Sequence, residues 1–262
     1  MKLQTARQFI LDRLQRGYYT FTRTDIDQVL GSGDATRMAL QRLRQQGWIF
    51  SPAKGFYIII DPQHQGTGYL PVEWFIEEWM QFAGGGYYIG LLSAAMLHGA
   101  AHHKPQVTQV VCDHRRANLR KGAYRVDFYF KQQIVSLMWE QRKSPAGYYR
   151  ISTPEMTAYD LLRYPKACPS LDLAATILAE LGERVDAERL ARLAELDTDT
   201  SVLQRLGWLL EATGWEEKSG PLARCLQERR RVWQPLRTDA PREGERNARW
   251  HILVNAEVEV DV

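Results

Sequence analysis

The sequence has few cysteines and no long apolar run. Its 262 residues include only Cys112, Cys168 and Cys225, an odd number without Cys-x-x-Cys spacing. This usage is typical of a reducing compartment and argues against a disulfide framework. The longest apolar stretch, YYIGLLSAAML, is shorter than the roughly 18 residues that suggest a membrane span. The opening MKLQTARQFILDRLQRG indicates an amphipathic helix rather than a signal sequence. We therefore expect a cytoplasmic protein that does not bind membranes.

Glutamate is absent from the first 60 residues. That segment contains nine Lys or Arg against four Asp, a net charge of +5, while the whole chain carries +3. The remaining 202 residues therefore sum to −2. A small basic module joined to a near-neutral body predicts that the module meets a polyanion. The connector DPQHQGTGYLP (61–71) is the expected boundary, with one domain over 1–62 and a second over 69–262.

The basic module has the element order of a winged helix-turn-helix. Apolar residues recur at helical spacing over 4–16, and Thr24 is the expected N-cap of a second helix that Gly31 ends. A third helix follows Ser32 and stops at Gly47. Two apolar strands then flank the turn PAKG (52–55). In this fold the third helix enters the major groove and the hairpin reaches a phosphate.

The third helix has two different faces. Thr36, Ala39, Leu40 and Leu43 share one arc, while Asp34, Arg37, Met38, Gln41, Arg42 and Gln45 lie opposite, with Arg44 at the edge. Arg pairs with guanine, Gln pairs with adenine, and further cations bind phosphates. The predicted DNA contacts are Thr36, Arg37, Gln41, Arg42, Arg44, Gln45 and Lys54. Two alternatives stay open: a solvated basic helix without a ligand, and a winged helix that binds protein instead of DNA.

The larger body has a mixed composition of strands and helices. Residues 87–98 are expected to form a buried helix. Over residues 106–151 apolar and polar side chains alternate, which predicts several strands. From the cap at Ser152 or Thr153 onward the pattern is helical, except for a terminal strand. The fold class is therefore α+β: a winged helix-turn-helix followed by a mixed α/β domain with a helical second half.

Two clusters could carry chemistry. His98, His102 and His103, with Cys112 and His114 nearby, suggest zinc, but Gly99 and Pro105 predict that the helix ends near His98, which breaks the i,i+4 geometry. Asp127 and Glu140, followed by Arg142, faintly resemble a metal-dependent nuclease motif. We favour hydrogen-bonding histidines and solvated strand residues. The prediction is a non-enzyme with no metal and no cofactor, and the alternative is a metal-dependent nuclease or nucleic-acid-processing enzyme targeted by its winged helix.

A basic loop over 114–125 lies between two predicted strands. It is most simply a solvated surface, and beside a DNA-binding module it could also be an auxiliary phosphate clamp or a partner contact. The residues of this possible basic patch are Arg115, Arg116, Arg120 and Lys121.

The order and spacing of several stretches resemble the AbiEi antitoxins, the transcriptional regulators of AbiE-type (type IV) toxin–antitoxin operons linked to phage defence and abortive infection. The stretches are MALQRLRQQGWIFSPAKGFYII, YYIGLLSAAMLHGAAHHKPQVTQVVC, YRVDFYF, GYYRISTPEMTAYDLLRYP and RWHILVN. They span nearly the whole chain.

The resemblance implies a repressor that binds inverted repeats of double-stranded DNA in its own operon promoter. It also implies a C-terminal domain that counteracts a nucleotidyltransferase-type toxin, and members of this type need not form a stable complex with the toxin. Only the helix after Ser32 and the hairpin tip gain a role from it. It assigns no metal to the histidines and no role to the charged loop 237–247.

Overall fold

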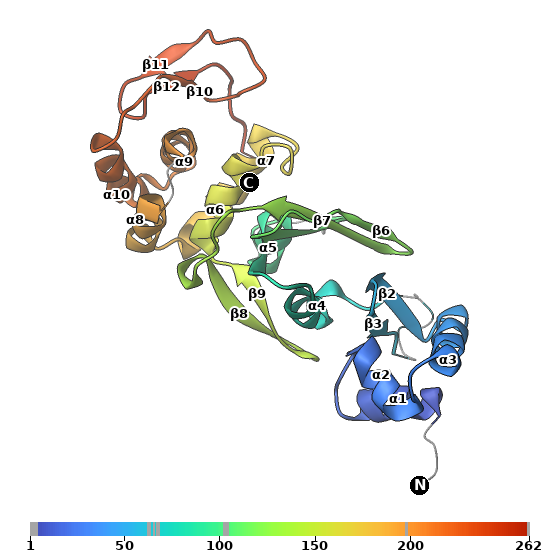
Figure 1. Cartoon of the computed structure of the whole chain (residues 1–262). Helices are drawn as coiled ribbons and strands as arrows, with labels where there is room; N and C mark the ends of the chain where they lie inside the picture. Colours follow the sequence, from blue (N-terminus) through green and yellow to red (C-terminus); the bar gives the residue numbers. More distant parts are fainter. Residues whose placement is uncertain are drawn as a thin grey trace.

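The computed structural model describes residues 5–61, 64, 66, 69–101, 105–196 and 199–260 and shows the expected α+β architecture. The chain begins with helices and strands in the order of a winged helix-turn-helix (Figure 1). These elements are α1 (Ala6–Gln15), β1 (Thr20–Thr22), α2 (Arg23–Leu30), α3 (Asp34–Gln45), β2 (Ile49–Ala53) and β3 (Phe56–Ile59). The strands pair antiparallel in the order β1-β3-β2.

Short-range hydrogen bonds decide where these helices begin. Thr22, rather than the expected Thr24, is the N-cap of α2: its hydroxyl accepts from the N–H of Asp25, and the Asp25 carboxylate accepts from the N–H of Thr22. This reciprocal pair satisfies two N–H groups at once and starts the helix two residues earlier. Gly31 and Gly47, both with positive φ, follow α2 and α3 as predicted.

A mixed sheet forms the middle of the molecule. Its strands lie in the order β6-β7-β5-β4-β9-β8, with parallel pairing of β5 with β7 and of β4 with β9. They are β4 (Tyr87–Ile89), β5 (Thr108–Cys112), β6 (Leu119–Lys121), β7 (Tyr124–Phe130), β8 (Trp139–Ser144) and β9 (Gly147–Ser152).

Alternate residues of the central strands face different cores. Tyr87 and Ile89 point toward α4 (Ile76–Ala83), whereas Tyr88 points toward α5 (Leu91–Leu97) and α6 (Pro154–Arg163). Helices therefore cover both faces of the sheet. A strand covered in this way needs apolar side chains in both directions.

One stretch differs from the expectation of a single helix over 87–98. Tyr87–Ile89 form strand β4, and the helix starts only after Gly90. Aromatic and β-branched residues favour a strand that is buried on both faces. A short apolar run of this kind does not distinguish strand from helix by its spacing. The basic loop also contains a short strand, β6, that pairs with β7.

The second half of the body is helical, as predicted. After α6 come α7 (Leu171–Leu181), α8 (Ala187–Leu196), α9 (Thr200–Ala212) and α10 (Glu216–Gln227). A small sheet closes the chain, formed by β10 (Gln234–Pro235), β11 (Glu245–Asn247) and β12 (Ile252–Val254). Short 3₁₀ turns occur at Val72–Trp74, Ser136–Met138 and Gly182–Arg184.

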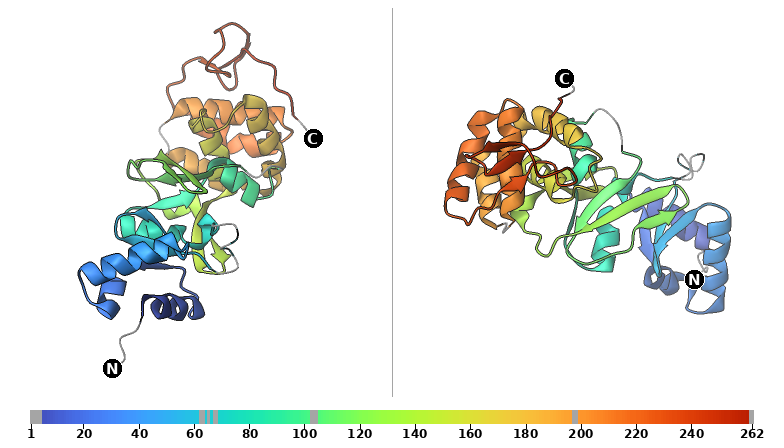
Figure 2. Two further views of the ribbon diagram at one scale, coloured as in Figure 1. Left: turned by 90° about the vertical axis from the view of Figure 1, so that its right-hand side faces the viewer. Right: turned by 90° about the horizontal axis from the view of Figure 1, so that it is seen from above.

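The winged helix and the body share one hydrophobic core. Phe56 and Ile58 of β3, with Ile60, pack against Leu70 and Phe75 of the body. Tyr57 and Ile59, which alternate with them in β3, pack on the other side of the strand against α1 and α3. Both views of Figure 2 place the winged helix and the helical half at opposite ends, with the central sheet between them. Across the described residues, no helix has the length and apolar composition that a membrane crossing requires.

We predict that Gly207→Ala destabilises the protein although it lies inside α9. Alanine is normally better than glycine in a helix by about 1 kcal/mol. At Gly207, however, a Cβ atom would overlap the ring of Trp250, which is fully buried. Overpacking of this kind costs about 1–3 kcal/mol and outweighs the gain in propensity. Chemical denaturation measures the change.

Gly220→Ala in α10 is the matched control. A Cβ there meets nothing closer than the Arg224 guanidinium at 4.0 Å. Gly220 precedes Pro221, whose ring disfavours helical backbone at a residue with a Cβ, and this offsets part of the propensity gain, so the variant should have about the stability of the wild type. Equal effects of the two substitutions would show that Trp250 does not constrain Gly207.

Candidate nucleic-acid interface

The turn between α2 and α3 is held from both sides. Its first and last residues, Gly31 and Gly33, have φ of 82° and 118°. The Thr36 hydroxyl donates to the carbonyl of Gly31, and the Arg23 guanidinium donates to that of Gly33 at 3.3 Å. Thr36 has no exposed surface, so the prediction that it contacts DNA is wrong. Its hydroxyl instead stabilises the turn that sets the direction of α3.

The other predicted contacts on α3 are exposed. Leu40 and Leu43 anchor the helix in the core of the winged helix. The opposite face projects into solvent at the outer edge of the molecule (Figure 1). The exposed candidates on it are Arg37, Gln41, Arg42, Arg44 and Gln45.

Arg37 has a partner within the helix. Its guanidinium lies 3.1 Å from the Asp34 carboxylate, and the two side chains are 71% and 88% exposed. An ion pair this exposed contributes little. Arg37 can therefore exchange Asp34 for a phosphate or a base edge at low cost.

The hairpin tip is both exposed and fixed in place. Lys54 is exposed, and Gly55, with φ of 85°, completes the turn. The carbonyl of Gly55 accepts from the N–H of Arg23 at 2.7 Å, which ties the tip to the start of α2. On its other side Gly55 faces the ring of Phe82 at the end of α4. The body therefore positions the wing.

The predicted basic patch is divided among internal contacts. Arg116 donates to the carbonyls of Ala83 and Gly84 and caps the end of α4. Arg120 pairs with the Asp127 carboxylate. Both guanidiniums make contacts within the body, and Arg120 remains exposed.

Lys121 joins the body to the wing. Its ammonium donates to the carbonyl of Ser51 in β2 at 3.0 Å and lies 5.5 Å from the centre of the Phe50 ring. The Phe50 ring in turn lies 4.4 Å from that of Tyr124 in β7. Three of the four predicted patch residues, Arg115, Arg120 and Lys121, stay exposed, and the Arg115 guanidinium lies 4.9 Å from the centre of the Phe130 ring. Sequence reasoning missed this wing–body contact because its partners are about 70 positions apart.

Two family profiles match the chain. The one described as "Transcriptional regulator, AbiEi antitoxin" matches residues 8–60, from α1 to the end of the hairpin. The one described as "AbiEi antitoxin C-terminal domain" matches residues 88–212, from β4 to the end of α9. The chain belongs to the AbiEi antitoxin family. Its family is therefore one of antitoxins that are also transcriptional regulators.

A solved structure supports the fold of this AbiEi protein. The chain is similar to the crystal structure of the RV2827C protein from Mycobacterium tuberculosis, with a TM-score of 0.68 and 18% sequence identity. The similarity covers 94% of this chain and 90% of that chain. A search among curated protein sequences gives no match.

The histidines that the structure describes do not form a shared site in this AbiEi protein. Helix α5 ends at Leu97, with His98 as its C-cap, so the predicted stop at Gly99 is confirmed. His102 and His103 lie outside the described residues. His114 is exposed and pairs with the Asp113 carboxylate. Within the described residues, no three His, Cys, Asp or Glu side chains gather as metal ligands would.

His98 is buried and uses both ring nitrogens. Nε2 lies 2.8 Å from the carbonyl oxygen of Ser152, and Nδ1 lies 3.2 Å from the Arg142 guanidinium. A carbonyl only accepts and a guanidinium only donates, so Nε2 carries the proton and the ring is neutral. Burial, followed by the charge of Arg142, lowers the pKa of His98, against the opposing effect of the Ser152 hydrogen bond.

The proposed nuclease carboxylates are far apart. Asp127 lies on β7 and Glu140 on β8, and three strands of the sheet separate them. At about 4.8 Å per strand they are about 19 Å apart across the sheet. Asp127 pairs with Arg120, and Glu140 lies 3.7 Å from Arg142. The two carboxylates cannot hold one metal ion. The alternative hypothesis of a nuclease site built from Asp127 and Glu140 is therefore wrong.

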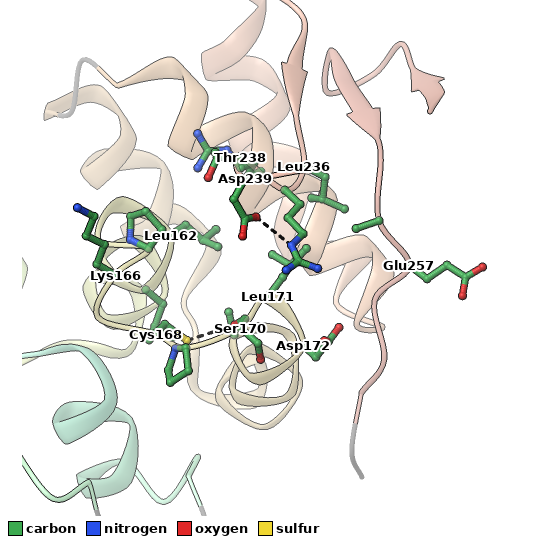
Figure 3. Close-up of a pocket in the computed structure, with 17 residues that line it drawn as sticks. Leu162, Lys166, Cys168, Ser170, Leu171, Asp172, Leu236, Thr238, Asp239 and Glu257 are labelled. Atoms are coloured by element: carbon green, nitrogen blue, oxygen red, sulfur yellow. Dashed lines mark hydrogen bonds and ion pairs between the residues drawn. The ribbon is translucent and has the colours of Figure 1, made fainter. Parts of the chain in front are cut away.

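A cavity of about 410 Å³ opens in the helical half (Figure 3). The loop between α6 and α7 and the segments around Arg237 and Glu257 line it. Arg237 pairs with Asp239 at 2.9 Å within its wall. The Cys168 thiol donates to the carbonyl of Ser170, and burial raises its pKa to about 11. The protonated thiol, which this pKa favours at neutral pH, is a poor nucleophile.

We predict that stability falls between pH 7 and pH 5 because of His98. Its pKa in the folded protein lies below the unfolded value near 6.5. The unfolded chain therefore takes up a proton in this range that the folded chain does not, and the free energy of unfolding decreases as the pH falls. Urea denaturation at pH 5, 6 and 7 measures this slope.

His98→Gln is the informative variant. Its amide can donate to Ser152 and accept from Arg142 but does not titrate. We expect a flatter pH dependence between pH 7 and 5. Asp113 and Asp199, whose pKa values are lowered, act at more acidic pH and leave this window unaffected. An unchanged slope in His98→Gln would contradict the assignment.

Proposed function

We propose that this AbiEi protein represses its own toxin–antitoxin operon by binding promoter DNA through α3 and the wing. The exposed face of α3 carries the proposal. Five Arg and Gln side chains project from one helix whose opposite face is buried. Such a surface offers bidentate partners for purine edges and cations for phosphates. The family profile over residues 8–60, that of a transcriptional regulator, supports the same function.

The rigid mounting of the wing supports binding at a defined register. Lys54 is presented on a tip that α2 and α4 hold from two sides. A pre-positioned cation loses less conformational entropy on binding than one on a free loop. The body thus contributes to DNA binding by placing the wing, in addition to any role of its own.

The body is proposed to counteract a toxin of the nucleotidyltransferase class. The support is the family profile of the antitoxin C-terminal domain over residues 88–212. The test is growth of cells that express the toxin encoded beside this gene, with the antitoxin supplied from an unrelated promoter. Rescue by a variant that cannot bind DNA would assign neutralisation to the body, and loss of rescue would contradict that assignment. Copurification then reports whether the two proteins touch.

We predict that Arg37→Ala/Gln41→Ala/Arg42→Ala abolishes specific binding to the promoter fragment. The three side chains are exposed, so the fold is retained while bidentate and phosphate contacts are lost. Each base contact is worth about 1–3 kcal/mol, so the combined loss should exceed a hundredfold in affinity. A gel-shift titration measures it.

The charge-matched control is Gln227→Ala/Arg230→Ala/Arg242→Ala. These residues are also exposed but lie at or after the end of α10, at the opposite end of the molecule. The control should bind the fragment like the wild type. If both triple variants bind equally well, α3 is not the DNA-binding element.

We predict that Lys54→Ala lowers the salt dependence of binding whereas Lys121→Ala does not. Each phosphate contact adds about 0.9 to the magnitude of the slope of log K against log salt concentration. Lys54 is exposed and free to contact a phosphate, while the Lys121 ammonium is bound to Ser51. Titrations at several salt concentrations give the slopes. A reduced slope for Lys121→Ala would assign it a phosphate contact and contradict its role in the wing–body contact.

A further inference from the structure

One line of residues on α3 lies farthest from the core. Successive helical residues are rotated by about 100°, so Asp34, Met38, Gln41 and Gln45 fall within an arc of about 60°. The buried residues Thr36, Leu40 and Leu43 lie on the opposite side. We call the line Asp34–Met38–Gln41–Gln45 the α3 ridge. When α3 enters a groove, this ridge penetrates deepest.

Arginines flank the α3 ridge on both sides. Arg37 and Arg44 lie about a quarter turn to one side, and Arg42 lies about as far to the other. In a groove these positions face the two sugar–phosphate walls, where cations are favoured. The ridge itself faces the base edges. Its members therefore reach deepest toward the base edges.

Met38 is the apolar member of the α3 ridge. Its side chain is 45% exposed although it is long and apolar. A single exposed apolar residue is common on protein surfaces and needs no explanation by itself. What distinguishes Met38 is its position at the centre of the face, one turn before Gln41 and between the flanking arginines.

Only one apolar group is displayed on the base edges of the major groove, the C5-methyl group of thymine. A methionine side chain is unbranched, flexible and polarisable, so it can pack against a methyl group without a fixed geometry. Gln41 and Gln45, on the same ridge, have the amide that pairs with adenine. The chemistry of Met38, Gln41 and Gln45 therefore matches A·T base pairs, while the Asp34 carboxylate of the ridge pairs with Arg37.

We propose that Met38 reads the C5-methyl group of a thymine in the operator. This inference rests on the proposed DNA binding through α3. It adds a specificity-determining residue and a base class: a thymine at the position that Met38 reaches, beside adenine contacts of the two glutamines. The contact buries the exposed thioether and the thymine methyl group together.

Replacement of thymine by deoxyuridine tests this contact because it removes the methyl group and leaves base pairing intact. Each thymine of the footprinted promoter site is replaced in turn, and affinity is measured for the wild type and for Met38→Ala. Burial of one methyl group corresponds to about a fourfold change in affinity. We expect a loss of this size at one thymine of the site for the wild type and none at that thymine for Met38→Ala.

Two further variants serve as controls for this test. Met38→Leu retains an apolar side chain and should keep the sensitivity to deoxyuridine. Leu196→Ala is the control, since Leu196 is 53% exposed but lies at the end of α8. It should behave as the wild type at every position.

The outcomes separate the inference from the function on which it rests. If the wild type binds the promoter but Met38→Ala shows the same deoxyuridine losses at every thymine, Met38 reads no methyl group and only the inference fails. If the wild type does not bind its promoter at all, the proposed function fails and the inference with it. Loss of sensitivity at one thymine in Met38→Ala alone supports both.

Discussion

Burial of strand β3 on both faces is the constraint on which the rest of the structure depends. Tyr57 and Ile59 pack with α1 and α3, while Phe56 and Ile58 pack with the body. All four residues are almost completely buried. Neither core is complete without this strand. The recognition helix and the body are therefore both packed on one strand, and this packing sets the position of α3 relative to the body.

This arrangement explains why basic residues that look alike in sequence have different uses. Arg116 and Lys121 lie where the body meets the end of α4 and the wing, so they bind backbone carbonyls at that junction. Arg42 and Arg44 lie on a helix whose outer face meets no other part of the described chain and stay available for a ligand. Charge alone does not distinguish the two groups. Their surroundings do, because carbonyl oxygens within reach occupy the donors of Arg116 and Lys121.

Contacts between residues that are distant in sequence also decide the roles of the histidines and the carboxylates. Four histidines close in sequence suggest a metal site, yet His98 is committed to Ser152 and Arg142 on distant strands. Asp127 and Glu140 lie only 13 positions apart in the chain but on strands that are not neighbours in the sheet. Strand order, which no local pattern encodes, decides which carboxylates meet.

The sequence by itself determined the features that depend on near neighbours. The order of helices and hairpin, the stops at Gly31 and Gly47, and the two faces of α3 follow from spacing, backbone freedom and amphipathicity within a dozen residues. The continuous apolar run Phe56–Ile60 is also typical of a strand that is buried on both faces, but it does not indicate which elements cover the strand. The tertiary structure alone decided that Thr36 supports a turn, that Tyr87–Ile89 form a strand and that Lys121 joins body to wing. These outcomes depend on hydrogen bonds and packing with a chain that has already folded back, and such contacts can outweigh local propensity.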